Sequence, residues 1–355
     1  MSEDLWSEQN TNPDAIEAAL RELLRERHAA NQGLAPARVL NLIVIVERSW
    51  KGEIANRLER VGRYHASRTV LCAVEEGRDT LDAVAVVRYE EGTGTFGVMT
   101  EQVEIDMGPE HLSGLETIVD PVVISEIPTV LWSPHGHHEA VAALRGMIDV
   151  MLLDSDDAPE ADGGLGHAEE ELSSSYVVDL AWLRTTPWRE RLASSFDRPA
   201  RRAVLGSLDG LTVRHQADST ASALLLAGWL STRLRWDIRP LEPMNGAGLR
   251  GRAYTGGPRY VDIRLQPIEQ EVPGLAGVTV AWEDGHSLSL DRAEGGLCAR
   301  EAWPGRDEDS WMVLGASRGE GGILGEGVRQ AHLRDPTYGP ALRAARELCL
   351  GTRVV

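Results

Sequence analysis

Cysteine is scarce in this chain. Its 355 residues include only Cys72, Cys298 and Cys349, which lie far apart in the sequence. The number is odd and no CxxC pair is present, so we do not expect a disulfide framework. Cys72 lies within an apolar run and is predicted to be buried as a small hydrophobic side chain.

Long apolar runs are missing as well. No stretch is long enough to cross a bilayer, although apolar residues make up 42% of the chain and suffice for a core. The first ten residues are acidic and polar, and they do not resemble a signal peptide. We therefore expect a cytoplasmic protein.

Positive charge is in the minority, and Lys51 is the only lysine. The formal net charge of −19 argues against binding to nucleic acids and to anionic membrane surfaces. The remaining cationic side chains are arginines, whose guanidinium groups can hold carboxylates or phosphates. We expect no nucleic-acid partner and no membrane contact.

Cofactor and metal motifs are not found. The first predicted strand is followed by ERSWKGEIAN, which contains neither GxGxxG nor a Walker phosphate loop. The densest group of possible metal ligands is His135, His137, His138 and Glu139, and its spacing matches neither a zinc finger nor HExxH. We also find no acid–base pair at a recognisable spacing. We therefore expect no cofactor, no bound metal and no catalytic residues.

Apolar spacing predicts an α/β domain over residues 38–172, preceded by a helix and linker over residues 1–37. Residues 38–47 and 69–74 are predicted to be buried strands, and residues 53–63 between them have helical spacing. This order forms a βαβ unit, so the sheet should be mixed and partly parallel. The other expected elements are a hairpin (82–89 and 97–106), helices over 110–123 and ending near 146, and strands over 128–132 and 148–154.

Two places in this domain are candidate ligand sites. His65, Ser67 and Arg68 precede the second strand and could bind a phosphate or serve a catalytic centre; alternatively, they cap the helix end and satisfy the strand termini. Residues 132–134 and 154–157 follow two later strands, at the carboxyl edge where such sheets bind ligands. The acidic segment 156–171 is expected to be a flexible linker.

Residues 173–355 are predicted to form an α+β domain. Residues 220–235 are apolar over most of their surface, as is typical of a helix buried against a sheet. Residues 202–216 alternate, with a turn expected at Asp209 and Gly210. An antiparallel meander and a final helix over 338–349 should follow. The predicted strands of the meander are residues 238–240, 252–254, 260–267, 277–282, 286–291 and 297–303.

Residues 179–197, DLAWLRTTPWRERLASSFD, join the two domains. Thr186 is placed to cap a helix whose first residue is Pro187, where a missing N–H costs nothing. This pattern predicts a helix–kink–helix joint with Trp182 and Trp188 packed in the core.

A second interpretation of the same stretch is a docking surface. Trp and Arg are frequent anchors of protein interfaces. The candidate anchors are Trp182, Arg184, Trp188 and Arg189. The residues themselves favour core packing, and both interpretations stay open.

Six segments carry a resemblance to a known family. They are RVLNLIVIV, HASR, DPVVISEIPTVLW, DLAWLRTTPWRE, ALLLAGWLSTRLRW and DPTYGPALRAA, in this order. They resemble the OpcA family, the glucose-6-phosphate dehydrogenase assembly proteins of actinobacteria and cyanobacteria. Ser133 stands where the family usually has a second aromatic residue, and Ala66 where it usually has the proline of an HPSR motif. We see no match to the regulatory cysteines of the cyanobacterial relatives.

The resemblance implies a non-enzymatic partner of glucose-6-phosphate dehydrogenase. Such a protein binds that enzyme, promotes its active oligomer and raises its activity, and so controls entry to the oxidative pentose phosphate pathway and the supply of NADPH. The alternative, taken from the residues, is an enzyme or sensor for a sugar phosphate that uses the cleft near His65, Ser67 and Arg68.

Overall fold

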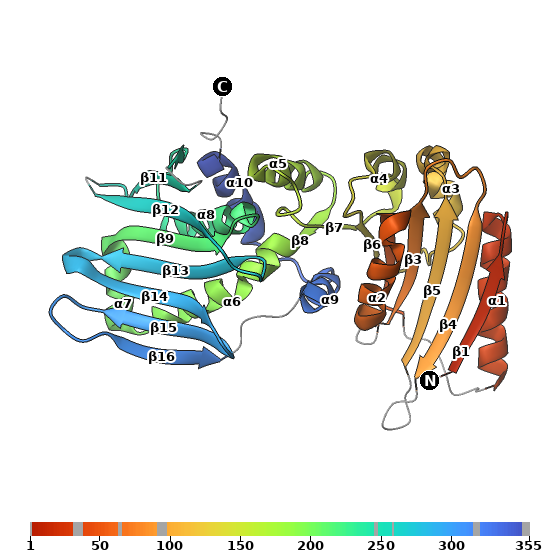
Figure 1. Ribbon diagram of the computed structural model, residues 1–355, viewed down its shortest axis with the longest axis horizontal. Coiled ribbons are helices and arrows are strands. Elements are labelled where there is room, and N and C mark those ends of the chain that lie inside the picture. The colour runs from red at the N-terminus through yellow and green to blue at the C-terminus, as the bar shows by residue number, and fades with distance from the viewer. Residues whose placement is uncertain are drawn as a thin grey trace. The chain divides into compact units, whose positions relative to one another are not determined.

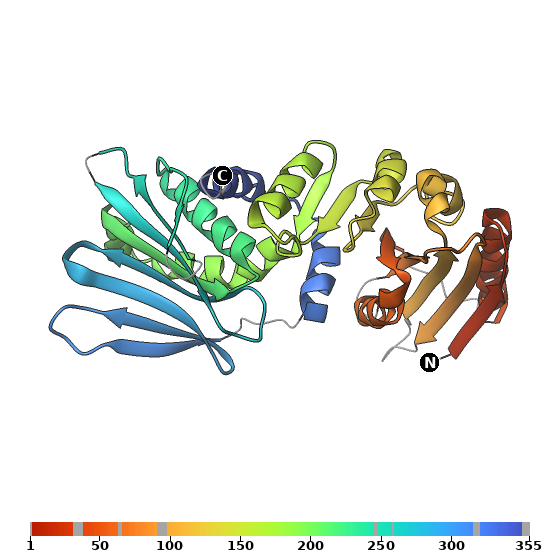
Figure 2. The same cartoon turned by 45° about the horizontal axis from the view of Figure 1, so that its top comes forward.

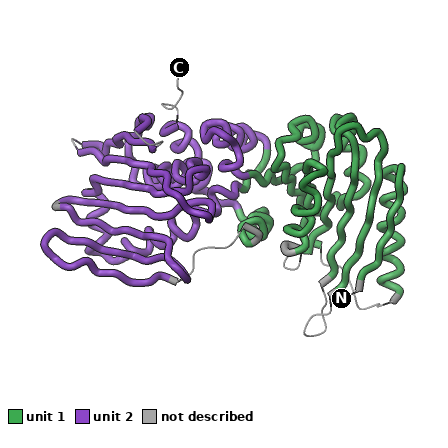
Figure 3. The backbone as a smooth tube through the Cα atoms, viewed as in Figure 1, with its two compact units in different colours: residues 1–153, 175–178, 320–333 green, residues 154–174, 179–319, 334–355 purple. Residues whose placement is uncertain are grey.

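The computed structural model describes residues 2–30, 38–62, 66–90, 98–244, 248–257, 259–314 and 320–349. These residues form two compact units (Figure 3). Unit 1 contains residues 1–153, 175–178 and 320–333, and unit 2 contains residues 154–174, 179–319 and 334–355. The predicted domain boundary between residues 172 and 173 stays a prediction. No described helix is both long enough and apolar enough for a membrane span.

Unit 1 is built on a mixed eight-stranded sheet with the order β1-β4-β5-β3-β2-β6-β7-β8 (Figure 1). β2 pairs in parallel with β3 and β6, whereas β4 is antiparallel to β1 and β5. The predicted mixed, partly parallel sheet is confirmed. Its strands are β1 (Ser2–Glu8), β2 (Leu40–Glu47), β3 (Ser67–Val74), β4 (Asp82–Glu90), β5 (Val98–Met107), β6 (Thr129–Trp132), β7 (Val150–Leu153) and β8 (Tyr176–Asp179).

Unit 1 also contains helices, of which α1 and α2 pack on the sheet and α9 packs against α2. The helices are α1 (Pro13–Ala30), α2 (Lys51–Gly62), α3 (Leu115–Val119), α4 (His138–Leu144) and α9 (Glu320–Gln330), with 3-10 turns at Arg48–Trp50, Pro109–Gly114 and Arg145–Met147. β2, α2 and β3 form the predicted βαβ unit. α1 buries Ile16 and Leu20 on its apolar stripe.

Two details of unit 1 differ from the prediction. The helix expected over residues 110–123 is a 3-10 turn followed by α3, which ends at Val119, because Pro121 has no N–H with which to continue the helical hydrogen bonds. Strand β1 was not predicted, because its sequence is mostly polar and it pairs on one side only, with β4 at the sheet edge.

Unit 2 is built on a second eight-stranded sheet with the order β10-β11-β12-β9-β13-β14-β15-β16. The strands β13 to β16 form the predicted antiparallel meander. β12 pairs with β9 in parallel, which was not predicted. The strands are β9 (Leu208–Gln216), β10 (Glu242–Pro243), β11 (Leu249–Tyr254), β12 (Tyr260–Ile268), β13 (Leu275–Trp282), β14 (His286–Ala293), β15 (Gly296–Ala302) and β16 (Asp309–Leu314).

Two local predictions in this sheet are wrong. β9 runs straight through Asp209 and Gly210, where a turn was expected, because Gly210 pairs with Asp262 on one side and Ala281 on the other. Residues 238–240 are not a strand. The nearby ladder is an isolated bridge between Asp237 and Tyr254, and Pro240 has no N–H to donate.

The helices of unit 2 pack against one face of this sheet, with α8 across β9 and β12 and α10 beside α8 (Figure 2). α8 is the predicted buried helix, and the α+β class is confirmed. A methyl group at Gly228 of α8 would lie 2.5 Å from the Ala341 carbonyl oxygen, so the two helices touch through backbone. The helices are α5 (Ala161–Glu171), α6 (Leu180–Ser195), α7 (Pro199–Arg202), α8 (Thr220–Leu234) and α10 (Tyr338–Cys349), with 3-10 turns at Ala203–Ser207 and Glu283–Gly285.

The segment expected to be a flexible linker, residues 156–171, is largely the helix α5. Its small residues allow close packing: a Cβ at Gly164 would lie 2.2 Å from the Ser155 carbonyl oxygen. Arg346 of α10 donates to the Asp162 carbonyl oxygen at 2.7 Å. The prediction failed because glycines that serve close packing have the same composition as glycines of a flexible segment.

Candidate functional site

Helix α6, which contains most of the DLAWLRTTPWRE stretch, begins at a buried carboxylate. Asp179 is the N-cap, and its Oδ1 accepts from the backbone N–H of Ala181 at 2.9 Å. The same side chain accepts from the Ser155 N–H at 3.1 Å, the Ser155 hydroxyl at 2.7 Å and the Tyr338 hydroxyl at 3.0 Å. Asp179 thus fixes two other segments of unit 2, at Ser155 and Tyr338, to the start of α6.

The predicted start of a new helix at Pro187, with a cap at Thr186, is wrong. α6 is continuous from Leu180 to Ser195, and Pro187 lies inside it. The two threonine hydroxyls before Pro187 accept from the same guanidinium group, since Arg189 donates to Thr185 Oγ1 and Thr186 Oγ1, each at 2.9 Å. Packing of the helix therefore outweighs the preference of proline for a first turn.

Trp182 and Arg189 form a stacked pair on α6. The guanidinium carbon of Arg189 lies 3.5 Å from the centroid of the Trp182 ring, which is a cation–π contact. The indole N–H of Trp182 donates to Asp335 Oδ2 at 2.9 Å. Burial lowers the pKa of Arg189 to about 10, and it remains charged at neutral pH.

All four candidate anchors lie inside unit 2. Trp182 is 3% exposed and Trp188 is 2% exposed, while the side chains of Arg184 and Arg189 are 9% and 11% exposed. In this arrangement they can influence a partner by holding α6 in place, but they offer it little surface. Their part in partner binding stays a prediction.

Three aspartates are buried at the start of α6. Asp154 forms a two-point ion pair with Arg184, with N–O distances of 2.8 and 2.6 Å. Asp156 accepts from the N–H of Ser222 at 3.0 Å and from its hydroxyl at 2.5 Å. Arg184 also lies 3.8 Å from Asp156, and Asp179 is held next to this pair by Ser155, so three carboxyl groups lie near one another and ionisation of all three is unfavourable.

The pKa values reflect this crowding. Burial, followed by the charge of Asp154, raises the pKa of Asp156 from 3.8 to about 7. The same two causes, in the same order, raise the pKa of Asp179 to about 6. Strongly shifted carboxyl groups occur at functional sites and in structural networks alike. This cluster was only partly predictable, because the sequence marked residues 154–157 but not their contacts with Asp179, Arg184 and Ser222.

The structure describes two of the three residues of the other predicted group. His65 lies outside the described residues. Ser67 is buried at the first position of β3, and its hydroxyl lies 3.4 Å from that of Thr69. Arg68 pairs with Glu101, at 2.8 and 2.7 Å, and donates to the Val122 carbonyl oxygen at 2.9 Å. Phosphate binding here stays a prediction, and it requires Arg68 to leave Glu101.

The carboxyl ends of β2 and β6 form a second candidate site in unit 1. The chain runs from β2 to β3 on one side of this pair and from β6 to β7 on the other side. The strand order therefore changes direction here, which makes this a topological switch point. Trp50 packs against His135, with ring centroids 5.5 Å apart, and His135 Nδ1 accepts from the Glu47 N–H at 3.2 Å. The Ser133 hydroxyl is buried there and has no hydrogen-bond partner among the described residues.

Two histidines after β6, His135 and His137, are uncharged at neutral pH. Burial lowers the pKa values of His135 and His137. His137 Nε2 lies 3.6 Å from Glu47 Oε1, beyond hydrogen-bonding distance. Among the residues that the structure describes, no group of three or more His, Cys, Asp or Glu side chains is arranged to hold a metal ion.

The turn after β2 is unlike a dinucleotide-binding turn. α2 begins at Lys51, whose ammonium group is held by Glu104 at 3.0 Å and by Asp106 at 2.8 Å. A pyrophosphate needs exposed backbone N–H groups at this helix start, whereas two carboxylates would repel it. Arg48 also lies 3.6 Å from Asp106. The local charges therefore disfavour a dinucleotide at this turn.

Two models of the OpcA family match adjacent parts of the chain, the first ending at residue 170 and the second beginning at residue 175. Residues 58–170 match the model of the N-terminal domain of a glucose-6-phosphate dehydrogenase subunit. Residues 175–342 match the model of the corresponding C-terminal domain. Together the two matches cover most of both units.

Curated relatives carry the same family name. A protein of Nostoc punctiforme is 30% identical over 48% of this chain and 36% of its own length, and one of Synechocystis sp. is 25% identical over 54% and 40%. Both are named "Putative OxPP cycle protein OpcA". The matches thus span well under half the length of these relatives.

Solved structures resemble the chain more weakly. A dehydrogenase from Chromobacterium violaceum has a TM-score of 0.45 and 12% identity, covering 88% of this chain and 95% of that one. An oxidoreductase from Sinorhizobium meliloti has a TM-score of 0.47 and 11% identity, covering 88% and 97%. Similarity at this level carries no argument about function. The two domain matches, the curated relatives and the six ordered segments show that the chain belongs to the OpcA family.

Proposed function

We propose that this protein binds glucose-6-phosphate dehydrogenase and raises its activity without catalysing a reaction itself. The observation that carries the proposal is the pair of domain matches, over residues 58–170 and 175–342, to models described as parts of a glucose-6-phosphate dehydrogenase subunit. The relatives named for the OxPP cycle agree with it.

A non-enzymatic role is supported by the charges at the switch point. An oxidoreductase of this fold type would place the pyrophosphate of a dinucleotide at the turn after β2. Glu104 and Asp106 lie there and hold the ammonium group of Lys51, so this lysine is not left for a phosphate. This arrangement favours a protein that acts through its partner's active site.

Activation follows from unequal binding. If the protein binds the active oligomer of the enzyme more tightly than the inactive form, it shifts the population towards the active form. A tenfold shift needs a difference of about 1.4 kcal/mol in binding free energy. We propose that Trp182, Arg184, Trp188 and Arg189 contribute by fixing α6, since their side chains are largely buried.

The test uses the purified protein and glucose-6-phosphate dehydrogenase from the same organism. NADPH formation is followed against glucose 6-phosphate concentration, and the mass of the mixture is measured by light scattering. We expect a rate increase together with a heavier complex. If neither rate nor mass changes, the proposal is wrong. If the protein alone converts glucose 6-phosphate or another phosphosugar, it is an enzyme.

A further inference from the structure

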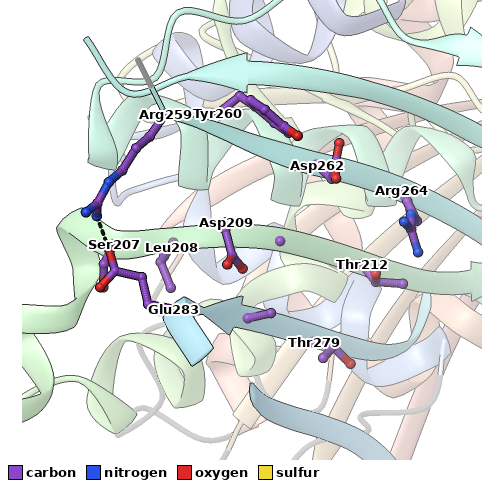
Figure 4. Close-up of a pocket in the computed structure, with 12 residues that line it drawn as sticks. Ser207, Leu208, Asp209, Thr212, Arg259, Tyr260, Asp262, Arg264, Thr279 and Glu283 are labelled. Carbon is purple, nitrogen blue, oxygen red and sulfur yellow. Dashed lines mark ion pairs between the residues drawn. The ribbon is translucent and has the colours of Figure 1, made fainter. Parts of the chain in front are cut away.

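The face of the unit 2 sheet that points away from α8 carries a polar hollow (Figure 4). Its volume is about 640 Å³, and it lies over three neighbouring strands, β12, β9 and β13. Small-molecule sites typically have volumes of about 300–1,000 Å³. The hollow lies within unit 2, and it was not predicted from the sequence.

The strand register explains why a hollow forms here. Gly210 on β9 lies directly between Asp262 on β12 and Ala281 on β13. Gly210 has no side chain and Ala281 has a single methyl group, which would lie 3.2 Å from a Cβ placed on Gly210. The floor is therefore low, and the longer side chains of neighbouring positions stand around it.

An ion pair closes one end of the hollow. Arg259, just before β12, pairs with Glu283, just after β13. Because β9 lies between these two strands, the pair passes over the start of β9, as the dashed line in Figure 4 shows. A ligand on the floor would thus be bounded at this end by one guanidinium and one carboxylate group.

Four polar side chains in the hollow keep their hydrogen-bonding capacity for a ligand. None of them forms a side-chain hydrogen bond or ion pair with the residues that the structure describes. They are Asp209, Thr212, Arg264 and the hydroxyl of Tyr260. Arg252 packs on the Tyr260 ring at 4.3 Å and donates to Asp262 at 3.2 Å. Unused acceptors, unused donors and an aromatic ring therefore surround one small space.

The composition of the lining selects among ligand classes. Three carboxylates, Asp209, Asp262 and Glu283, face two guanidinium groups, Arg259 and Arg264, which disfavours a polyanion such as a nucleotide. The lining is polar and apolar in about equal parts, which disfavours a lipid. A sugar ring fits both conditions, because its hydroxyls donate to carboxylates and accept from guanidinium groups, while its C–H face packs on an aromatic ring.

We propose that this hollow binds the hydroxyl-rich ring of a hexose, either free or as a hexose phosphate. Asp209 and Asp262 accept hydrogen bonds from ring hydroxyls, and Thr212 and Arg264 donate to the ring or to an attached phosphate. Sugar binding can be measured without the dehydrogenase, so the proposal stands or falls independently of the proposed function.

The experiment measures binding to the full chain with glucose, glucose 6-phosphate and inorganic phosphate as separate probes. Saturation-transfer NMR reports the ring protons, and titrations give dissociation constants, which we expect on the order of millimolar for an open polar site. Asp209→Asn should weaken both sugars about tenfold, because it removes charge-assisted hydrogen bonds. Asp209 is exposed and has no side-chain partner among the described residues, so the melting temperature should not change.

Arg250→Gln is the matched control. Arg250 pairs across the strands with Arg264 and shares its exposed face, but it does not line the hollow. Its substitution should leave both dissociation constants unchanged. Arg264→Gln tests whether Arg264 contacts the sugar ring or an attached phosphate. If only the binding of glucose 6-phosphate is weakened, Arg264 contacts the phosphate. If the binding of glucose and of glucose 6-phosphate is weakened equally, Arg264 contacts the ring.

Three results would overturn the proposal. The first is no saturation transfer from either sugar. The second is an equal effect of Asp209→Asn and Arg250→Gln, which would mean non-specific attraction to the sheet face. The third is binding of inorganic phosphate as tight as that of glucose 6-phosphate, with no effect of Asp209→Asn, which would mean an anion site.

Discussion

The buried carboxyl group of Asp156 should make the stability of this protein fall as the pH rises. Its pKa is about 7 in the folded protein, compared with 3.8 for an ordinary aspartate. Between these two values the folded chain holds a proton that the unfolded chain has lost. The favourable contribution is complete below pH 3.8 and is lost as the pH rises through 7.

The variant Asp156→Asn isolates this effect. The amide is neutral at every pH, and its oxygen can still accept from the Ser222 N–H. The Ser222 hydroxyl can donate to the Ala181 carbonyl oxygen, 3.2 Å away, and accept from the new amide. The native hydrogen bonds are therefore largely kept while the buried negative charge is removed.

The magnitude follows from the titration of one group. Between pH 5.5 and pH 8.0, a group of pKa about 7 changes the free energy of unfolding by roughly 2 kcal/mol. Histidines with lowered pKa values, such as His215, act in the opposite direction below pH 6.5. The difference between variant and wild type cancels them. It should shift in favour of the variant by about 2 kcal/mol over this range.

The assay is urea unfolding of both proteins at several pH values. Asp209→Asn is the control, since it makes the same substitution at an exposed side chain. Parallel profiles for Asp156→Asn and the wild type would refute the reasoning, because they would mean that Asp156 is ionised throughout.

Three further predictions test the packing described above, the first with a matched control. Gly164→Ala should destabilise unit 2, because a Cβ there lies 2.2 Å from the Ser155 carbonyl oxygen, while Gly163→Ala in the same helix has nothing within 4 Å and should stabilise it by about 0.5–1 kcal/mol in thermal unfolding. Trp188→Ala should cost about 3–5 kcal/mol in urea unfolding; lost dehydrogenase binding without a stability loss would make Trp188 an anchor instead. Arg68→Ala should cost about 2 kcal/mol by removing one partner of buried Glu101, and phosphosugar-induced stabilisation that persists in this variant would exclude Arg68 from a phosphate site.

Elements with a strong apolar pattern were predictable from the sequence. β2, β3 and α8 are buried almost throughout, and each came from a continuous apolar run. Periodicity reports burial directly, and burial is what holds these elements in place. The βαβ connection followed from their order, as did the mixed character of the first sheet.

Elements that depend on close approach or on a neighbour were not predictable. α5 is acidic and glycine-rich, and only the nearness of Ser155 to Gly164 shows why a small residue is required there. β1 is an edge strand that pairs with β4, and nothing in its own sequence indicates this pairing. The aspartate cluster joins residues 154, 156 and 179 to Ser222 and Tyr338, and no local pattern announces a contact across such separations.

The stretch around α6 shows why residue type alone cannot identify an interface. Trp182, Trp188 and Arg189 have the composition of a docking surface, yet each is spent on contacts within unit 2. A surface that binds a partner must be exposed before it binds. Tryptophans that meet this condition are Trp50, 47% exposed, and Trp311, 40% exposed, and neither lies on α6. Substituting either of these two tryptophans should leave stability nearly unchanged. A loss of dehydrogenase binding in such a variant would therefore mean a lost contact with the enzyme. For the buried tryptophans of α6, a loss of binding could equally result from lost stability.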